Sequence, residues 1–426
     1  LIVDSLRISG PDSNEFLIPD LTFPLSIPAG PDSQPLQLRF NPLSAGAKND
    51  LLLIYSNDPL SPASLNLNAL GLLDLTPAAI TLDTSSLSFI TGSNSPMEVI
   101  TKDDECIIQN VSVFVRSGGR QVYRQTNFTQ TDDTLWSAVI PGQQVTERGL
   151  EYYLEVCHGG AITCYPQNGA TEPEIGFVQV PTLSFPDATL NSRYQMISVP
   201  VQTGEQKLID LFQDDLGTYD NINYRFFDWN SDSSEYVELS ALDIPLPPGK
   251  ALWLITRDAT VLDLENAQSN LDSADFTVQL KAGWNMIADP FAFTVSWDQI
   301  DHDYIQGHTL WYYNGDAWII DSLLVPYRGY AVQVISDTAL YIPAQETESP
   351  LVPKPVPAAE WHLQITADNG TQYDHYNYAG IRLAASDDWD ICDISEPPGI
   401  GNFVSIYFQK DTAVSFPGRL AGDFRE

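Results

Sequence analysis

Leu65-Asn-Leu-Asn-Ala69 places an apolar side chain at every second residue, with a polar one between. The same rhythm returns in segments 36–40, 111–115 and 404–408. Successive side chains of a β-strand point to opposite faces, so a period of two predicts strands with one face in a core and one in water. The chain's 30 prolines and 26 glycines separate these runs. Many short strands between turn residues predict an all-β fold of sandwiches or barrels.

The chain has 426 residues, more than one β-domain commonly holds. Single cores stop growing at roughly 250–300 residues, so we expect several domains. The hydrophobic content of 43% is enough for each to bury a core. We interpret the chain as a piece of a longer polypeptide. The expected divisions are 1–75, 76–181, 182–349, a Pro-rich linker 350–357, and an incomplete C-terminal module 358–426.

The first module has a recognisable order of motifs. Phe16-Leu-Ile-Pro19 precedes Ile27-Pro-Ala-Gly30, and Ile54-Tyr-Ser-Asn-Asp-Pro59 precedes a closing Gly71. Asn, Asp and Pro form strong turns, because Pro sets φ and the Asn and Asp side chains bond nearby backbone. This order resembles the choice-of-anchor D and ASH-type immunoglobulin-like modules. The resemblance implies an immunoglobulin-like sandwich and says almost nothing about a ligand.

The second module contains Leu135-Trp-Ser-Ala-Val-Ile140 and Glu151-Tyr-Tyr-Leu-Glu-Val156. It resembles the fibronectin type III or immunoglobulin-like spacers of secreted bacterial proteins. We expect Trp136 to be its core aromatic residue. The chain would then be a tandem array of immunoglobulin-like sandwiches.

The third region contains an internal repeat. Arg193-Tyr-Gln-Met-Ile-Ser-Val-Pro200 matches Gly283-Trp-Asn-Met-Ile-Ala-Asp-Pro290, and segment 248–254 parallels 328–334. Two such copies predict a duplicated β domain, with halves of about 182–275 and 276–349 that share one core. The motif resembles a repeat in large secreted proteins of Bacteroidetes-type bacteria, of the kind exported by type IX secretion. This resemblance implies a secreted protein at the bacterial cell surface.

The net charge of −36 excludes two classes of partner. A nucleic-acid backbone would be repelled, and so would an anionic membrane surface. No apolar run approaches the roughly 18–20 residues of a membrane-spanning helix. We therefore expect neither nucleic-acid binding nor membrane insertion.

Two of the four cysteines flank a hairpin tip. Cys157 and Cys164 enclose His158-Gly-Gly-Ala-Ile-Thr163. Strands leaving such a turn can bring Cβ atoms close enough for a disulfide, which would fit an oxidising exterior. We expect that disulfide; the alternative is two unpaired thiols in a reducing compartment. Cys106 and Cys392 have no evident partner.

Two acidic segments are candidate Ca²⁺ sites, because Ca²⁺ takes six to eight oxygen ligands. The first holds Asp228, Asn230 and Asp232, but Ser233 and Leu239 stand where a calcium loop has Gly and Glu. The alternative for this segment is a polar hairpin tip. For the second segment the alternative is a solvated acidic loop. That segment contains Asp387, Asp388, Asp390, Asp393 and Glu396.

Motifs of catalysis are missing from the sequence. It contains no GxSxG elbow, no HExxH pair and no phosphate-binding glycine loop after a strand. We therefore expect no enzyme. Aromatic side chains could stack on sugar rings, or they could be core residues of the duplicated unit. These are Trp229, Trp311, Tyr312, Tyr313 and Trp318.

Together these features predict a non-enzymatic extracellular segment that acts in adhesion, scaffolding or surface assembly. Its expected partners are other modules of the same polypeptide, copies of itself, or a surface polysaccharide. One alternative is an accessory region of a secreted peptidase or glycosidase. A second alternative is a carbohydrate-binding stalk.

Overall fold

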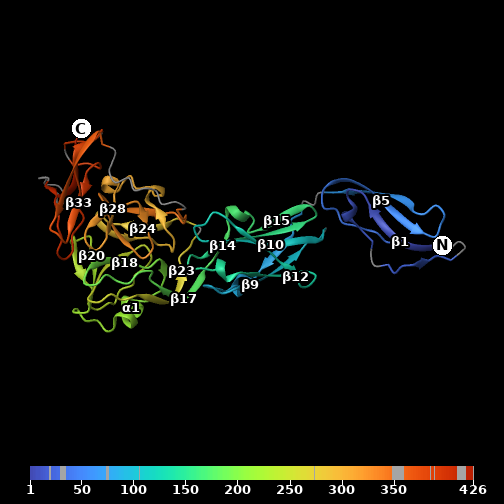
Figure 1. Cartoon of the computed structure of the whole chain (residues 1–426), viewed down its shortest axis with the longest axis horizontal. Coiled ribbons are helices and arrows are strands. Elements are labelled where there is room, and N and C mark those ends of the chain that lie inside the picture. The colour runs from blue at the N-terminus through green and yellow to red at the C-terminus, as the bar shows by residue number, and fades with distance from the viewer. Residues whose placement is uncertain are drawn as a thin grey trace.

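The fold is all-β: in the computed structural model 50% of the residues lie in strands and 7% in helices. The sheets follow one another in an extended row from the N-terminus to a larger C-terminal body (Figure 1). No described helix has the length and apolarity needed to cross a bilayer. The described residues are 1–18, 21–28, 35–72, 76–104, 106–272, 274–347, 359–383, 385–387, 389–409 and 419–425.

The N-terminal part contains an antiparallel sheet of order β3-β1-β5-β6 and a separate strand pair β2-β4. A buried ion pair supplements its small core: Lys48 Nζ donates to Glu15 Oε1 at 2.6 Å and to Ser44 Oγ at 2.7 Å. The elements are β1 (Ile2–Ser9), η1 (Ser13–Glu15), β2 (Phe16–Leu17), β3 (Leu25–Ser26), β4 (Arg39–Phe40), β5 (Gly46–Ser56) and β6 (Ala63–Gly71).

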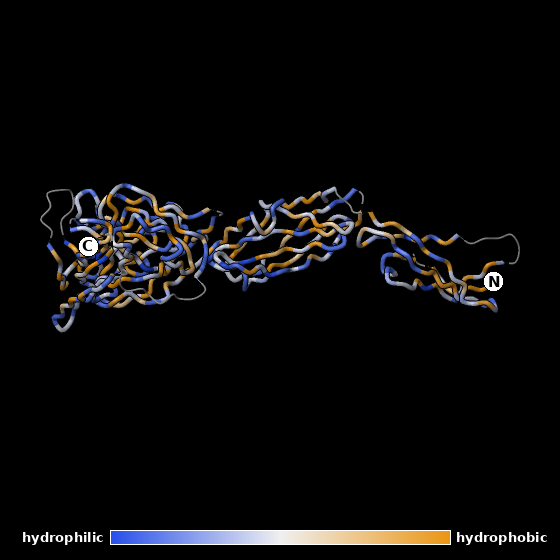
Figure 2. The backbone as a smooth tube through the Cα atoms, turned by 90° about the horizontal axis from the view of Figure 1, so that it is seen from above, coloured by the Kyte–Doolittle hydropathy of each residue, from blue (hydrophilic) through white to orange (hydrophobic). Residues whose placement is uncertain are grey.

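The middle part is a sandwich of two sheets, β11-β10-β14-β15 with β16 on β14, and β12-β13-β9-β7. Hydrophobic and hydrophilic residues alternate along its strands (Figure 2), and the inward side chains form one core. Trp136 belongs to that core, as expected. The strands are β7 (Ala79–Leu82), β9 (Ser95–Lys102), β10 (Ile108–Ser117), β11 (Arg124–Asn127), β12 (Thr129–Gln130), β13 (Leu135–Ile140), β14 (Leu150–His158), β15 (Ala161–Tyr165) and β16 (Glu174–Gly176). Its 3₁₀ turns are η2 (Thr84–Ser86), η3 (Gly142–Gln144) and η4 (Gly169–Thr171).

One strand joins the sandwich to the C-terminal body. β17 (Val178–Ser184) pairs in parallel with β8 (Phe89–Ile90) and antiparallel with β23 (Asp263–Ser269). β19 (Val201–Gln202) completes this sheet, in the order β19-β23-β17-β8. The division expected at 181/182 therefore falls inside a continuous strand instead of a linker.

The repeat forms two four-stranded sheets of equivalent order, β18-β22-β20-β21 and β25-β30-β27-β28. In each sheet, the matched sequence motifs lie in the first two strands of this order. The first sheet contains β18 (Tyr194–Ser198), β20 (Tyr224–Asn230), β21 (Glu235–Glu238) and β22 (Ala251–Thr256). The second contains β25 (Gly283–Ala288), β27 (Leu310–Tyr313), β28 (Trp318–Asp321) and β30 (Gly329–Val334).

Smaller elements complete both halves. The first half also contains helix α1, whose Leu208, Leu211 and Phe212 are buried. These elements are α1 (Leu208–Leu216), β24 (Phe276–Leu280), β26 (Val295–Ser296), η5 (Trp297–Gln299), η6 (Gln306–His308), β29 (Leu323–Leu324) and β31 (Thr338–Ile342).

The two halves share a core of aromatic rings. The ring centroid of Trp253 lies 5.2 Å from that of Tyr313 and 5.6 Å from that of Trp318. Gly329 permits the close approach, because a Cβ there would lie 2.5 Å from the Ala251 Cβ and 2.7 Å from the Met196 Cβ.

The C-terminal sheet packs onto the second half of the repeat instead of standing alone. Tyr378 and Phe424 enter one hydrophobic cluster with Trp311 and Ala331. The sheet has the order β32-β33-β36-β34, with β33 and β36 parallel. Its strands are β32 (Trp361–Asp368), β33 (Tyr373–Ile381), β34 (Ile394–Ser395), β35 (Phe408–Gln409) and β36 (Arg419–Arg425). The expected linker 350–357 lies outside the described residues.

Candidate functional site

The first predicted calcium segment forms the tip of the β20–β21 hairpin. Asp228 Oδ2 accepts a hydrogen bond from Lys250 Nζ at 2.6 Å, which neutralises that carboxylate. Asn230 Oδ1 accepts from the backbone N–H groups of Asp232 and Ser233, at 3.0 and 3.1 Å. These bonds close a hairpin turn and engage two of the three predicted ligands, Asp228 and Asn230.

The second segment uses its carboxylates to shape its own loop. Asp390 accepts from the backbone N–H groups of Ser386 at 2.5 Å and Cys392 at 2.7 Å. Asp393 has no solvent exposure. It accepts from the N–H groups of Asp390 and Phe424, both at 3.2 Å. Asp393 therefore fastens this loop to β36.

The remaining members of that segment differ in their surroundings. Asp387 is exposed, and Asp388 lies outside the described residues. Glu396 Oε1 accepts from Ser405 Oγ at 2.7 Å. Burial raises the pKa of Glu396 to about 8; the Asp374 carboxylate adds to the rise, and the Ser405 hydroxyl and Arg419 oppose it. A carboxyl group that stays protonated near neutral pH is a poor Ca²⁺ ligand, so the surroundings of Glu396 disfavour the predicted calcium site.

A different acidic group lies beside α1. One carboxylate oxygen each of Asp214, Asp215 and Asp263 lies within 4.8 Å of the others, the one such cluster among the described residues. Asp215 Oδ2 already accepts the backbone N–H of Asp263 at 2.7 Å. Burial raises the pKa of Asp215. Sequence reasoning missed this group because Asp263 lies on a strand distant in the chain.

The expected disulfide between Cys157 and Cys164 is wrong: both thiols are free. The register of β14 and β15 pairs Cys157 with Ile162 and Glu155 with Cys164, so the two cysteines are diagonal neighbours. Diagonal residues of an antiparallel pair lie roughly 7–8 Å apart, beyond the usual Cα separation of a disulfide. Burial raises the pKa of both thiols, which disfavours the reactive thiolate.

The same hairpin holds a buried polar triad. His158 Nδ1 lies 3.0 Å from Asp103 Oδ2, and His158 Nε2 lies 2.8 Å from Thr163 Oγ1. The order carboxylate–imidazole–hydroxyl matches that of nucleophilic hydrolases. However, Thr163 Oγ1 also accepts the Ala78 N–H at 3.1 Å, and His158 is only 1% exposed. Its evident role is to fasten the hairpin to the strand that enters the sandwich.

The aromatic residues considered for sugar stacking are mostly interior. Trp311 and Tyr313 are 2% and 5% exposed, and Trp318 packs on Trp253. Trp229 packs edge-on against Tyr236, with centroids 4.8 Å apart. These rings therefore stabilise the repeat, and they do not form a flat stacking surface.

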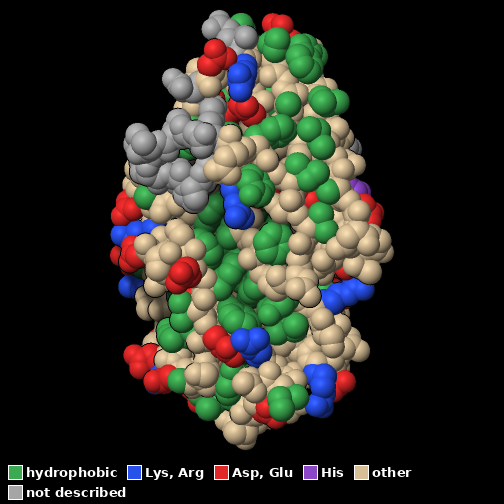
Figure 3. Space-filling view, turned by 90° about the vertical axis from the view of Figure 1, so that its left-hand side faces the viewer, with side chains coloured by type: hydrophobic (Ala, Val, Ile, Leu, Met, Phe, Trp, Pro, Cys, Tyr) green, Lys and Arg blue, Asp and Glu red, His purple; other side chains and the backbone are tan. Residues whose placement is uncertain are grey.

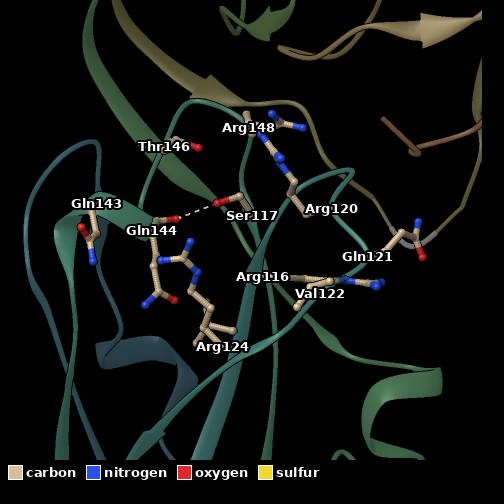
Figure 4. A pocket seen from close by; sticks show the side chains of 11 residues that line it. Arg116, Ser117, Arg120, Gln121, Val122, Arg124, Gln143, Gln144, Thr146 and Arg148 are labelled. Carbon is tan, nitrogen blue, oxygen red and sulfur yellow. Dashed lines mark hydrogen bonds between the residues drawn. The ribbon is translucent and has the colours of Figure 1, made fainter. Parts of the chain in front are cut away.

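A cavity of about 540 Å³ opens at the end of the sandwich that faces the C-terminal body (Figure 4). Its wall comes from the end of β10, the following loop, the start of β11, η3 and the loop before β14. Four of the eleven lining residues are arginines, and none is acidic. They are Arg116, Arg120, Arg124 and Arg148.

Two glutamates form ion pairs with three of these arginines. Glu151 accepts from Arg116 Nε at 2.5 Å and from its Nη2 at 3.1 Å. Glu346 lies 2.8 Å from Arg120 Nε, and its Oε1 accepts from Arg148 Nη1 at 3.0 Å. Glu346 comes from the segment after β31, so two of the lining arginines also contact the C-terminal body.

Comparison with protein-family models and with curated proteins found no match. The resemblance to choice-of-anchor D and ASH-type modules therefore stays a prediction.

Proposed function

We propose that this chain is a non-enzymatic extracellular segment that acts as a scaffold and presents its surface for adhesion or assembly. The observation that carries the proposal is the extended row of filled sheets (Figure 1). Hydrophobic clusters fill the sandwich and both halves of the repeat. Such a body is suited to holding its two ends apart.

The junction between sandwich and body is braced, which a spacer requires. β17 runs through both parts, and Glu346 reaches back to Arg120 and Arg148. The Glu346 N–H also donates to the Gly119 carbonyl at 3.0 Å. Several independent contacts of this kind restrict bending between the two parts.

The far end of the body offers a surface for another module or for a second copy. β32 is an edge strand of its sheet, and its Trp361 and Leu363 are 55% and 56% exposed. Apolar side chains gather on this end face among scattered charges (Figure 3). Unpaired edge strands with apolar side chains are common sites of association.

Small-angle X-ray scattering on the full chain tests the scaffold. A compact chain of this length would have a radius of gyration of roughly 22 Å; we expect a clearly larger value. A compact particle would contradict the proposal.

Sedimentation velocity tests association through the end face. We expect self-association that increases with concentration and is lost in the double variant Trp361→Glu, Leu363→Glu. The control is Ile222→Glu, because Ile222 is 72% exposed but lies in the loop before β20. If both variants self-associate to the same extent, β32 is not the site of association.

A further inference from the structure

Two histidines in the second half of the repeat share one hydrogen-bonding pattern. His302 Nδ1 lies 2.7 Å from the carbonyl oxygen of Ile300, and His308 Nδ1 lies 3.3 Å from that of His302. A carbonyl oxygen only accepts, so each Nδ1 carries a proton, and Nε2 of the neutral ring has a free lone pair. Metal-binding histidines have this arrangement, because their second ring N–H donates to a carbonyl or carboxylate oxygen. Both Nε2 atoms are therefore in the form that binds a metal.

Both Nε2 atoms are accessible. The two side chains are half-buried, and neither Nε2 has a hydrogen-bond partner within the described part of the chain. Some polar atoms of this chain are fully enclosed without a partner, such as Gln306 Oε1, but neither Nε2 is one of them. The two nitrogens therefore face solvent, and an ion can reach them without a rearrangement of the core.

The spacing of the two rings fits a single ion. Their centroids lie 5.9 Å apart, and the ring planes are inclined by 71°. With metal–nitrogen bonds of about 2.0–2.1 Å, two imidazoles on one ion have centroids roughly 5 to 6.5 Å apart, depending on the angle at the ion. The observed separation of His302 and His308 falls inside this range.

The turn that carries the pair is held in place. The ring of His302 stacks on that of Trp297, with centroids 5.2 Å apart and an interplanar angle of 22°. Trp297 Nε1 donates to the His308 carbonyl oxygen at 3.2 Å. Gln306 Nε2, from the same turn, donates to the Asp390 carbonyl oxygen at 2.5 Å. Because these contacts already order both rings, little conformational entropy is lost when an ion joins them.

The ligand type selects the metal. Imidazole nitrogen suits copper, nickel and zinc, whereas calcium and magnesium take oxygen ligands. Asp301 and Asp303 flank His302 and are exposed, and the net charge of −36 attracts cations. The one three-residue cluster of ligand atoms among the described residues lies elsewhere, beside α1, so water is left to fill the remaining positions of an ion here.

We propose that His302 and His308 together bind one divalent transition-metal ion through their Nε2 atoms. Cu²⁺ binds most tightly among the first-row divalent ions at a site of this ligand type, so it is the probe of choice. This inference goes beyond the scaffold role and does not depend on it.

Electron paramagnetic resonance of the full chain with one equivalent of Cu²⁺ tests the proposal, in about 0.15 M salt to screen the acidic surface. We expect the splitting of two coordinated nitrogens. His302→Phe keeps a ring for Trp297 to stack on and removes both nitrogens, so it should lower the Cu²⁺ affinity at least tenfold in a competition titration with glycine. The matched control is His362→Gln, which removes an exposed imidazole on β32 and should leave the affinity unchanged.

A second variant removes the other ligand. His308 has a left-handed backbone, with φ of 54°, and Asn tolerates that conformation. His308→Asn should therefore fold and should also lower the Cu²⁺ affinity at least tenfold. Thermal midpoints of the metal-free variants show that each chain remains folded.

Fluorescence locates the ion. Bound Cu²⁺ quenches the emission of a tryptophan close to it, so Trp297→Phe should lose most of the Cu²⁺-dependent quenching while it still binds the ion. The proposal is overturned by no binding at micromolar Cu²⁺, by a spectrum of oxygen ligands alone, or by equal affinities of His302→Phe and His362→Gln. Quenching that persists unchanged in Trp297→Phe would place the ion at another site and would also overturn it.

Discussion

Single polar residues fix segments of this molecule that apolar packing alone does not hold. Lys48 joins Glu15 inside the N-terminal part, and Asp393 fastens a loop to β36. Asp289 has no solvent exposure; its Oδ1 accepts the Phe291 N–H at 2.9 Å, and burial raises its pKa well above the ordinary value. The charge state of a buried acid therefore affects the stability of the chain segments that it contacts.

Glu396 gives a pH-dependent stability that can be measured. Because its folded-state pKa is raised to about 8, the folded chain binds one more proton than the unfolded chain between about pH 4.3 and 8. The stability is therefore fully present below about pH 4.3 and is lost as pH rises toward 8. Glu396→Gln stays neutral at every pH. Its free energy of unfolding should therefore rise relative to that of the wild type by at most about 1.4 kcal/mol per pH unit in that window.

Urea unfolding of both proteins at several pH values measures this difference. Asp387→Asn serves as the control, because Asp387 is exposed. If the difference in free energy of unfolding between Glu396→Gln and the wild type stays constant with pH, Glu396 ionises normally.

At the scale of elements, the two repeat sheets are joined by ring packing. Trp253 on β22 is fully buried, and its ring meets those of Tyr194 and Tyr236, at centroid distances of 6.4 and 6.0 Å, as well as those of the other half. Edge-to-face ring pairs add to the burial of apolar area. Removing one such ring affects both sheets.

Trp253→Ala should lower the free energy of unfolding of the C-terminal body by about 3–5 kcal/mol, because it leaves a large cavity between the sheets. The matched control is Trp361→Ala on β32, where the ring is 55% exposed and the loss should be about 0.5 kcal/mol or less. Urea denaturation monitored by circular dichroism compares them. Equal losses would contradict a shared aromatic core.

The two acidic loops belong to the same scale. We expect millimolar Ca²⁺ to leave the thermal midpoint unmoved, because Lys250 neutralises Asp228 and backbone N–H groups occupy Asp390 and Asp393. A ligand that binds only the folded state must raise the midpoint. A rise with Ca²⁺ that disappears in Asp390→Asn would instead establish the predicted calcium site.

At the scale of the whole molecule, Glu346 connects the sandwich to the C-terminal body through its ion pairs with Arg120 and Arg148. Glu346→Gln leaves Arg120 and Arg148 without their partner, at a cost of about 1–3 kcal/mol. We expect a broader distribution of radii in small-angle scattering and faster amide exchange around β17. The control is the exposed Glu360→Gln. Scattering identical to that of the wild type would show that β17 alone keeps the junction straight.

Much of the architecture could be predicted from local patterns. Alternation along 111–115 predicted β10, and the repeated Met-Ile motif marked two strands that hold equivalent places in their sheets. Helix α1 was missed, although Leu208, Leu211 and Phe212 have the i, i+3, i+4 spacing of a helical face. Nine residues give too short a pattern to stand out among strands.

The candidate site was harder to predict. Arg116, Arg120 and Arg124 stand four residues apart, and such a basic cluster in an acidic chain was a usable signal. Gln144 and Arg148 come from a different loop, and Glu346 from a different part of the chain. The predicted disulfide was wrong for a related reason, because the register of β14 and β15 decides which residues face one another.

The sequence alone determined the strands, the duplication and the acidic surface, because each depends on composition or on neighbours along the chain. Only the tertiary structure decided that the C-terminal sheet shares a core with the repeat and that arginines converge at a braced junction. Contacts between distant residues depend on strand register and on the packing of whole sheets. A pattern of period two shows which side chains of a strand share a face, but it does not say which strands become neighbours.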